Sequence, residues 1–244
     1  MRKLMSVALV GLAAFAAVAD EGRVDRSWEW SPLGVGIAAP LQLPFTDSSV
    51  YGLRFGGFFG RNYDVYGLDA GVVEMTEGEF AGIQASGFNW SSRNVYAVQF
   101  GGVANVVHGS FYGVQLGSVN LVFAEPFYGV QVGAIYNGNV SLGGIQLGTV
   151  NVDSSYFGGL QAGVLANVVK EDAEGLSVAL VNFMNRFTGL ELGFVNAAEE
   201  CTGVQIGAFN AADRLTGMQF GFLNLVCNDP LLNVPVMPVV NASF

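Results

Sequence analysis

Three tandem copies of one fourteen-residue pattern, between Thr188 and Asn224, constrain the fold of this chain more than any other feature. The copies read TGLELGFVN, TGVQIGAFN and TGMQFGFLN. Each one places Gly, an apolar residue, Gln or Glu, a second apolar residue, Gly and Asn in the same order. A short fixed period predicts that each copy is one structural unit that packs against its neighbours.

The pattern continues toward the N-terminus, where successive copies start fourteen to sixteen residues apart. Twelve copies begin at Gly52, Gly67, Gly82, Ala97, Gly113, Gly129, Gly144, Gly159, Gly175, Gly189, Gly203 and Gly217. The residues that define the repeat are Gly113, Gln115, Gly117 and Asn120 in one copy, and Gly203, Gln205, Gly207 and Asn210 in another. We therefore expect a tandem-repeat β-domain over residues 52–229.

Apolar residues flank the Gln slot, which lies two positions after the repeat Gly, and this alternation is typical of a strand with one polar face. The Gln slot also holds Arg54, Asp69 and Glu191. Charged side chains are hardly ever fully buried without a partner. The sequence therefore predicts that the Gln slot faces water and that the apolar slots on either side face the core.

The alternation breaks near the second Gly and the Asn slot, which indicates a bend or bulge inside every copy. Odd and even copies have the same turns, so each copy is a complete unit, either a hairpin or one coil of a solenoid. We expect an all-β fold, a shallow closed β-barrel of about twelve hairpin repeats of about 15 residues each. A parallel β-solenoid, with Gln and Asn stacked in ladders, is the alternative.

Two proline-marked segments flank the repeats: residues 20–51, with Pro32, Pro40 and Pro44, and residues 230–244, with Pro235 and Pro238. Proline confines a strand to a sheet edge. An open sheet would leave both segments as bare edges, which natural proteins avoid. We expect Leu33–Leu43 to pair with Asn233–Phe244 and so to close the barrel.

The first nineteen residues have the organisation of a signal peptide. Arg2 and Lys3 precede an apolar run, and Ala17-Val18-Ala19 fits the rule for signal peptidase. Removing residues 1–19 changes the formal charge from −10 to −12, since Arg2 and Lys3 are the only charged residues among them. We expect an exported protein of the periplasm, outer membrane or cell surface. An acidic protein is a poor partner for nucleic acid.

The tandem G-x-Q-x-G-x-x-N copies and the C-terminal PVMPVVNASF resemble a bacterial surface-repeat family of diderm bacteria, over roughly residues 32–244. That family is similar to predicted β-flower proteins, so the resemblance implies a shallow closed barrel of hairpin petals. Many members look like lipoproteins, but this chain has no Cys near the cleavage point. The resemblance implies no activity that transfers residue by residue.

Residues with catalytic or metal-binding chemistry are sparse. The single histidine, His108, lies in a turn, where we expect it to be solvated, and a catalytic triad or His-rich metal site needs more. Cys201 and Cys227 occupy different slots of the repeat, which favours two buried free thiols over a disulfide. No Gly-Lys-Ser/Thr end of a phosphate-binding loop is present. We expect no enzymatic activity, cofactor or metal.

Tyrosines occupy the slot before the repeat Gly in several copies: Tyr51, Tyr66, Tyr96, Tyr112 and Tyr128. A row of tyrosines forms either an interface belt for a membrane or sugar, or cross-strand packing within a sheet. Two functions remain open. One is a structural or interaction protein that docks on a membrane or envelope partner. The other is a carrier of a lipid-like ligand inside the barrel. The sequence leaves the oligomeric state open.

Overall fold

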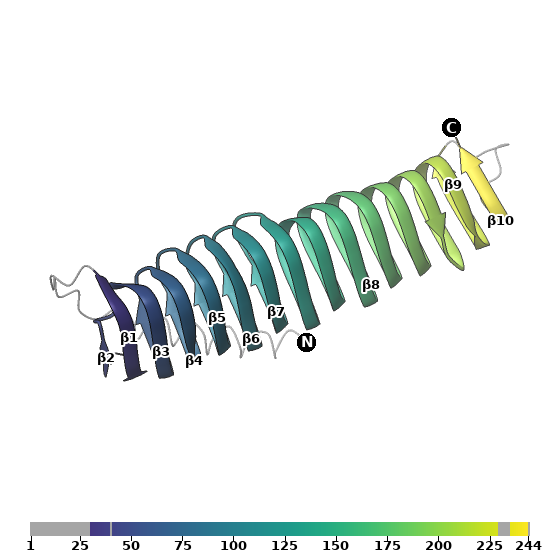
Figure 1. Cartoon of the computed structure of the whole chain (residues 1–244). Helices are drawn as coiled ribbons and strands as arrows, with labels where there is room; N and C mark the ends of the chain where they lie inside the picture. The colour runs from purple at the N-terminus through teal and green to yellow at the C-terminus, as the bar shows by residue number, and fades with distance from the viewer. Residues whose placement is uncertain (1–29, 40, 229–234, 244) are drawn as a thin grey trace.

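The computed structural model describes residues 30–39, 41–228 and 235–243 (Figure 1). The described chain is a stack of about 13 coils, a β-solenoid whose axis runs the length of the molecule (Figure 1). Strand accounts for 88% of the structure, and the described residues contain no helix. The expectation of an all-β fold is therefore confirmed, and the expected closed barrel of hairpins is wrong.

One sheet contains all ten strands, in the order β10-β9-β8-β7-β6-β5-β4-β3-β1-β2. The strands are β1 (Trp30–Ala38), β2 (Leu41–Leu43), β3 (Ser49–Asn62), β4 (Val65–Thr76), β5 (Phe80–Ser91), β6 (Val95–Val107), β7 (Phe111–Val122), β8 (Phe127–Ile206), β9 (Phe209–Asn228) and β10 (Val236–Ser243). β8 is long because its chain stays extended through the turns between several coils.

Neighbouring coils pair in parallel, with equivalent residues of consecutive copies in register. Gln99 lies beside Gln115, and Asn105 lies beside Asn120. Hairpins would instead pair antiparallel strands within each copy. The in-register parallel pairing therefore identifies each copy as one coil, which is the alternative that the repeat pattern left open.

The repeat glycine allows the coils to stack closely. Eleven of the twelve positions that start a copy hold a glycine with positive φ, between 119° and 151°. A Cβ at Gly129 would lie 1.9 Å from the carbonyl oxygen of Gly113 in the preceding coil. Only glycine tolerates both this backbone conformation and this approach, which explains why the slot is conserved along the chain.

Four columns of side chains fill the interior. Apolar residues two positions before the repeat Gly form the first, which includes Phe80, Phe111, Phe127, Phe157 and Phe187. The Gln slot and the Asn slot form the second and third. The fourth, two residues after the Asn slot, changes along the axis from Thr76 and Ser91 to Val107 and Val122, and later to Asp153 and Val169.

The prediction that the Gln slot faces water is wrong, because Gln115 and its equivalents are fully buried. The apolar slots on either side point outward instead: Leu68 is 50% exposed and Phe100 is 42% exposed. Stacked amides donate to one another, so these polar groups find partners inside, although the Gln161 and Gln219 amide oxygens accept no hydrogen bond. Arg54 and Asp69, in the same slot of consecutive copies, also pair with each other.

The two ends of the solenoid lie far apart (Figure 1). The prediction that Leu33–Leu43 pairs with Asn233–Phe244 is therefore wrong. Each end carries its own short antiparallel strand: β2 pairs with β1, and β10 pairs with β9. These strands cover the outermost parallel strands, which is the protection that an exposed sheet edge needs. The expected signal peptide, residues 1–19, lies outside the described residues.

Candidate functional site

The Asn slot forms a continuous hydrogen-bonded ladder. The Asn120 Nδ2 donates to Asn137 Oδ1 in the next coil at 2.9 Å, and also to the carbonyl oxygen of Val132 at 2.7 Å. The same two bonds recur in most copies from Asn89 to Asn210. The second glycine makes room for this ladder, because a Cβ at Gly117 would lie 2.7 Å from Asn120 Oδ1.

The Gln slot forms a second ladder with the opposite polarity. The Gln115 Nε2 donates backward to Gln99 Oε1, and the Gln131 Nε2 donates to Gln115 Oε1, both at 2.9 Å. In the Asn ladder each Nδ2 donates forward, to the following coil. The repeat-defining residues therefore build the two ladders and the close contacts between coils: Gly113, Gln115, Gly117 and Asn120, with Gly203, Gln205, Gly207 and Asn210.

A buried ion cluster ends the Gln ladder on its N-terminal side. The Gln84 Nε2 donates to Asp69 Oδ2 at 2.7 Å, and Arg54 holds Asp69 with two bonds of 2.7 and 2.6 Å. Glu74 lies 3.2 Å from the same guanidinium and occupies the Asn slot. Burial raises the pKa of Glu74 in spite of Arg54. When Glu74 is protonated, the charged groups of the cluster are the Arg54 cation and the Asp69 anion, which neutralise each other.

Two further carboxyls lie in the interior without a cation. Burial raises the pKa of Asp153 to about 8, although Asn139 donates to it, and raises the pKa of Glu191 to about 8, although Gln205 donates to it at 2.5 Å. Both folded pKa values exceed those of the unfolded chain. The folded state therefore holds more protons between about pH 4 and pH 8, and its stability falls as the pH rises through that window.

The exterior is unusually poor in charge. Only three charged residues of the described coils lie between a repeat Gly and the next Asn slot, namely Arg54, Asp69 and Glu191, and all three are buried. Apolar residues cover the turn that joins the two halves of each coil. We call this turn the apolar edge; its members are more than half exposed and comprise Phe58, Val72, Val103, Ile135, Val164, Leu180, Phe194 and Phe222.

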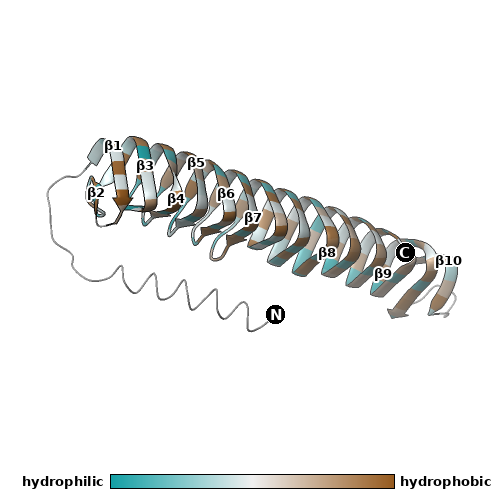
Figure 2. Cartoon of the chain, turned by 90° about the horizontal axis from the view of Figure 1, so that it is seen from below, coloured by the Kyte–Doolittle hydropathy of each residue, from teal (hydrophilic) through white to brown (hydrophobic). Residues whose placement is uncertain are grey.

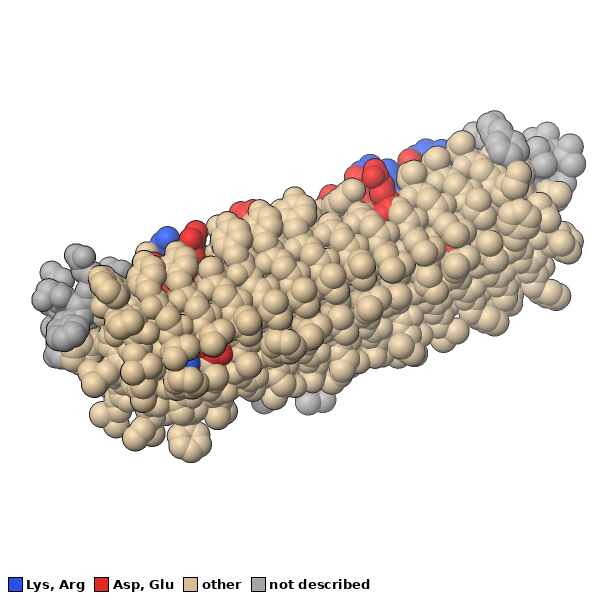
Figure 3. Space-filling model, in the orientation of Figure 1, with Lys and Arg blue, Asp and Glu red and all other residues tan. Residues whose placement is uncertain are grey.

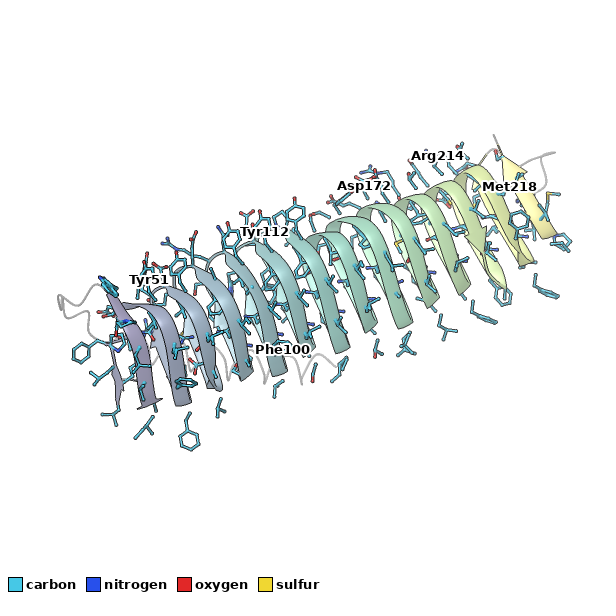
Figure 4. All side chains as sticks on the ribbon, viewed as in Figure 1. Tyr51, Phe100, Tyr112, Asp172, Arg214 and Met218 are labelled. Carbon is cyan, nitrogen blue, oxygen red and sulfur yellow. The ribbon has the colours of Figure 1, made fainter. Side chains whose placement is uncertain are left out.

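Charged residues gather instead along the turn between consecutive copies, which we call the charged edge (Figure 3). It includes Glu77, Glu79, Arg93, Glu125, Glu171, Asp172, Glu174, Arg186, Glu199, Glu200, Asp213 and Arg214. Asp172 and Arg214 lie along one side of the stack and Phe100 along the other (Figure 4). The brown bands of apolar residues continue over the coils from one end to the other (Figure 2). The solenoid is therefore amphipathic across its axis.

The candidate interface tyrosines form two stacks at the margin of the charged edge, where Tyr51 and Tyr112 are seen (Figure 4). Tyr51 stacks on Tyr66 with ring centroids 4.9 Å apart, and Tyr112 stacks between Tyr96 and Tyr128 at 5.0 and 5.4 Å. The inner ring faces contact one another, so they are not available to stack on a sugar ring. The observed geometry is cross-strand packing, with ring edges and hydroxyls outward.

His108 and the cysteines differ in part from their expected environments. His108 is half-buried between Trp90 and Phe123, with ring centroids at 4.7 and 5.4 Å, and burial lowers its pKa. The expectation of a solvated turn residue is therefore wrong. Both cysteines are free, as expected, and Cys201 is buried, but Cys227 is exposed.

The described coils offer little for catalysis or ligand capture. They contain no group of three residues able to hold a metal ion, and none of their segments is a helix suited to crossing a bilayer. A cavity of about 10 Å³ lies near Arg54, Gln42 and Asn62, and it has room for about one water molecule. No protein-family model matches the chain, and neither a curated protein nor a solved structure was found to resemble it.

Sequence reasoning missed the main surface feature, the apolar edge. The signal was present: residues after the second Gly are mostly small or apolar, and between each repeat Gly and the next Asn slot only Arg54, Asp69 and Glu191 are charged. The sequence alone assigns these apolar slots to the core, where an absence of charge is expected. It therefore does not predict an uncharged exterior. Once the amide columns are placed inside, the same slots become an uncharged exterior.

Proposed function

We propose that this protein is a non-enzymatic structural or interaction protein of the cell envelope, and that it acts by docking its apolar exterior on a membrane or envelope partner. One observation carries the proposal: the uncharged exterior continues along the coils, with Val103, Val164 and Phe222 each 65–78% exposed. Soluble monomers rarely expose apolar patches larger than a few hundred Å². Such a surface indicates a binding partner.

Two features of the sequence support an envelope location. Residues 1–19 have the organisation of a signal peptide, and the repeats resemble those of a bacterial surface-repeat family. The alternative, a carrier of a lipid-like ligand, requires an open apolar interior. The four interior columns are filled by side chains in the described coils, so the structure favours docking over carriage.

Fractionation of the producing bacterium tests the proposal. We expect the protein in the envelope fraction, with an N-terminus at Asp20, and we expect the purified mature chain to enter the detergent phase on temperature-induced separation of a non-ionic detergent. A protein found in the cytosol with Met1 intact would contradict export. Recovery of the mature chain only from the aqueous phase would contradict docking through the apolar exterior.

A further inference from the structure

We propose that the solenoid inserts edge-first into one leaflet of a phospholipid membrane, with the apolar edge deepest in the hydrocarbon and the charged edge in water. This inference rests on the proposed function and names its partner as the lipid itself. The distribution of charge orients the molecule. Moving the edge that carries Glu171, Asp172 and Arg186 into hydrocarbon would cost the free energy of desolvating these charges, whereas the apolar edge has no exposed charge to desolvate.

The height of the solenoid matches a single leaflet. The first strand of a coil runs from Tyr112, beside the charged edge, to Ser118 on the apolar edge. Six residues of extended chain span about 20 Å. A bilayer has a hydrocarbon core about 30 Å thick, so one leaflet provides about 15 Å. The uncharged band is long enough to fill one leaflet and too short to cross two.

Two side-chain hydroxyls on the apolar edge already have partners within the protein, as a lipid environment requires. The Ser118 Oγ donates to the carbonyl oxygen of Gly102 at 2.8 Å, and the Thr149 Oγ1 donates to that of Ala134 at 2.6 Å. Backbone groups of the strands on either side of the edge bond between coils along the axis, and the register shifts at the edge itself, between Gly117 and Val119. The Gln and Asn amides face inward, so the exterior of this band presents little except hydrocarbon.

Tyrosines mark the expected water–lipid boundary. Tyr96, Tyr112 and Tyr128 lie one position before the repeat Gly and are 40–47% exposed. The Tyr66 and Tyr156 hydroxyls are each 3.3 Å from a carboxylate, those of Glu79 and Glu174. An aromatic ring with its body toward hydrocarbon and its hydroxyl toward charge is typical of a membrane interface.

A lipid leaflet fits this surface better than a second copy of the chain. About 13 coils at about 4.8 Å each give broad faces of about 60 by 20 Å, or about 1,200 Å². One such face would suffice for a stable dimer, which buries about 800 Å² per partner. Exposed apolar residues occur on both faces, however: Leu68 and Ile83 on the first strand, Phe183 and Leu223 on the second. A dimer leaves one face and part of the edge in water.

Depth-dependent fluorescence quenching tests the orientation. The native thiols are first removed by Cys201→Ala, a residue that Ala173 already shows to be accepted in that slot, and Cys227→Ser. A fluorophore is attached either at Val164→Cys on the apolar edge or at Glu171→Cys on the charged edge. Each protein is mixed with phosphatidylcholine vesicles brominated on the acyl chains. We expect severalfold quenching at position 164 and none at position 171.

A charge series provides the matched control. The triple variant Val103→Asp, Ile135→Asp, Val164→Asp changes only exposed side chains, so it should fold, and we expect its affinity for the vesicles in flotation to fall at least tenfold. The triple variant Glu125→Gln, Glu199→Gln, Asp213→Asn, which changes exposed residues of the charged edge, should bind within twofold of the parent. Circular dichroism checks that both variants are folded.

Three outcomes would overturn the inference. Failure of the folded parent to float with vesicles, when the protein still fractionates with the envelope, would exclude lipid as the partner and leave a protein partner under the proposed function. Equal quenching at positions 164 and 171 would contradict edge-first insertion. A stable dimer in light scattering that shields position 164 without lipid would assign the apolar edge to a second copy.

Discussion

Breaking the Asn ladder in the middle of the stack tests whether directional hydrogen bonds hold the coils together. The Asn137→Ala variant removes a fully buried side chain that makes three hydrogen bonds. Its Nδ2 donates to Leu147 O and to Asn151 Oδ1, both at 2.8 Å, and its Oδ1 accepts from Asn120 at 2.9 Å.

The expected cost follows from what is left without a partner. Three lost hydrogen bonds contribute about 1 kcal/mol each, and the orphaned Asn151 Oδ1 adds a desolvation penalty of about 1–3 kcal/mol. We therefore expect the Asn137→Ala variant to be about 4–6 kcal/mol less stable than the parent. The control is Thr149→Ala, which removes one hydroxyl bond on the exposed edge and should cost under about 1 kcal/mol.

Urea unfolding followed by circular dichroism measures the free energy of unfolding, and hydrogen exchange localises the loss. Because each coil contacts only its neighbours, protection should fall mainly in the coils that contain residues 120–151. If Asn137→Ala costs no more than Thr149→Ala, the ladder does not stabilise the stack. If protection falls evenly in every coil, the nearest-neighbour account of stability is wrong.

Three further predictions use the interior and the ends. Gln115→Arg should prevent folding, because it buries a charge between two neutral amides, whereas Leu116→Arg on the outer face should fold; equal circular dichroism spectra would contradict the face assignment. Between pH 5 and pH 7, deprotonation of Asp153 and of Glu191 should each lower the stability by about 1 kcal/mol per pH unit, and urea midpoints of Glu191→Gln should depend less on pH. Deleting Val236–Ser243 should unfold only the last coils, and a single low-temperature melt of the whole chain would exclude a modular solenoid.

The repeat and the all-β class were predictable because they depend on local spacing. Which face is buried was not, because it depends on contacts between copies. Gln115 alone is a polar residue that should face water. Gln115 between Gln99 and Gln131 is a satisfied interior amide, and the difference is visible only when equivalent positions are placed in register. The opposite charges of Arg54 and Asp69, one copy apart, were the clearest sign of that register.

The predicted pairing between the two ends of the chain was wrong for a different reason. Proline and apolar alternation correctly indicate strands at the ends of the sheet, where β2 and β10 are the edges and β1 lies one strand in, but they do not specify the partner of an edge. Pairing between the two termini and local capping at each end both remove bare edges, and sequence gives no preference between them. The structure uses local capping, in which the Asn224 Nδ2 donates to Met237 O of β10 at 3.2 Å.

The amide columns also explain how this chain distinguishes its inside from its outside. Apolar residues such as Phe111 point inward and others such as Phe100 point outward, so hydrophobicity alone does not assign the faces. If the exterior meets lipid as proposed, burial of apolar surface stabilises both arrangements nearly equally. Turning a coil inside out would expose the Gln115 and Asn120 amides to hydrocarbon, at a cost of several kcal/mol for each unpaired group. The ladders therefore specify the orientation and register of each coil, and the apolar columns fill the space that remains.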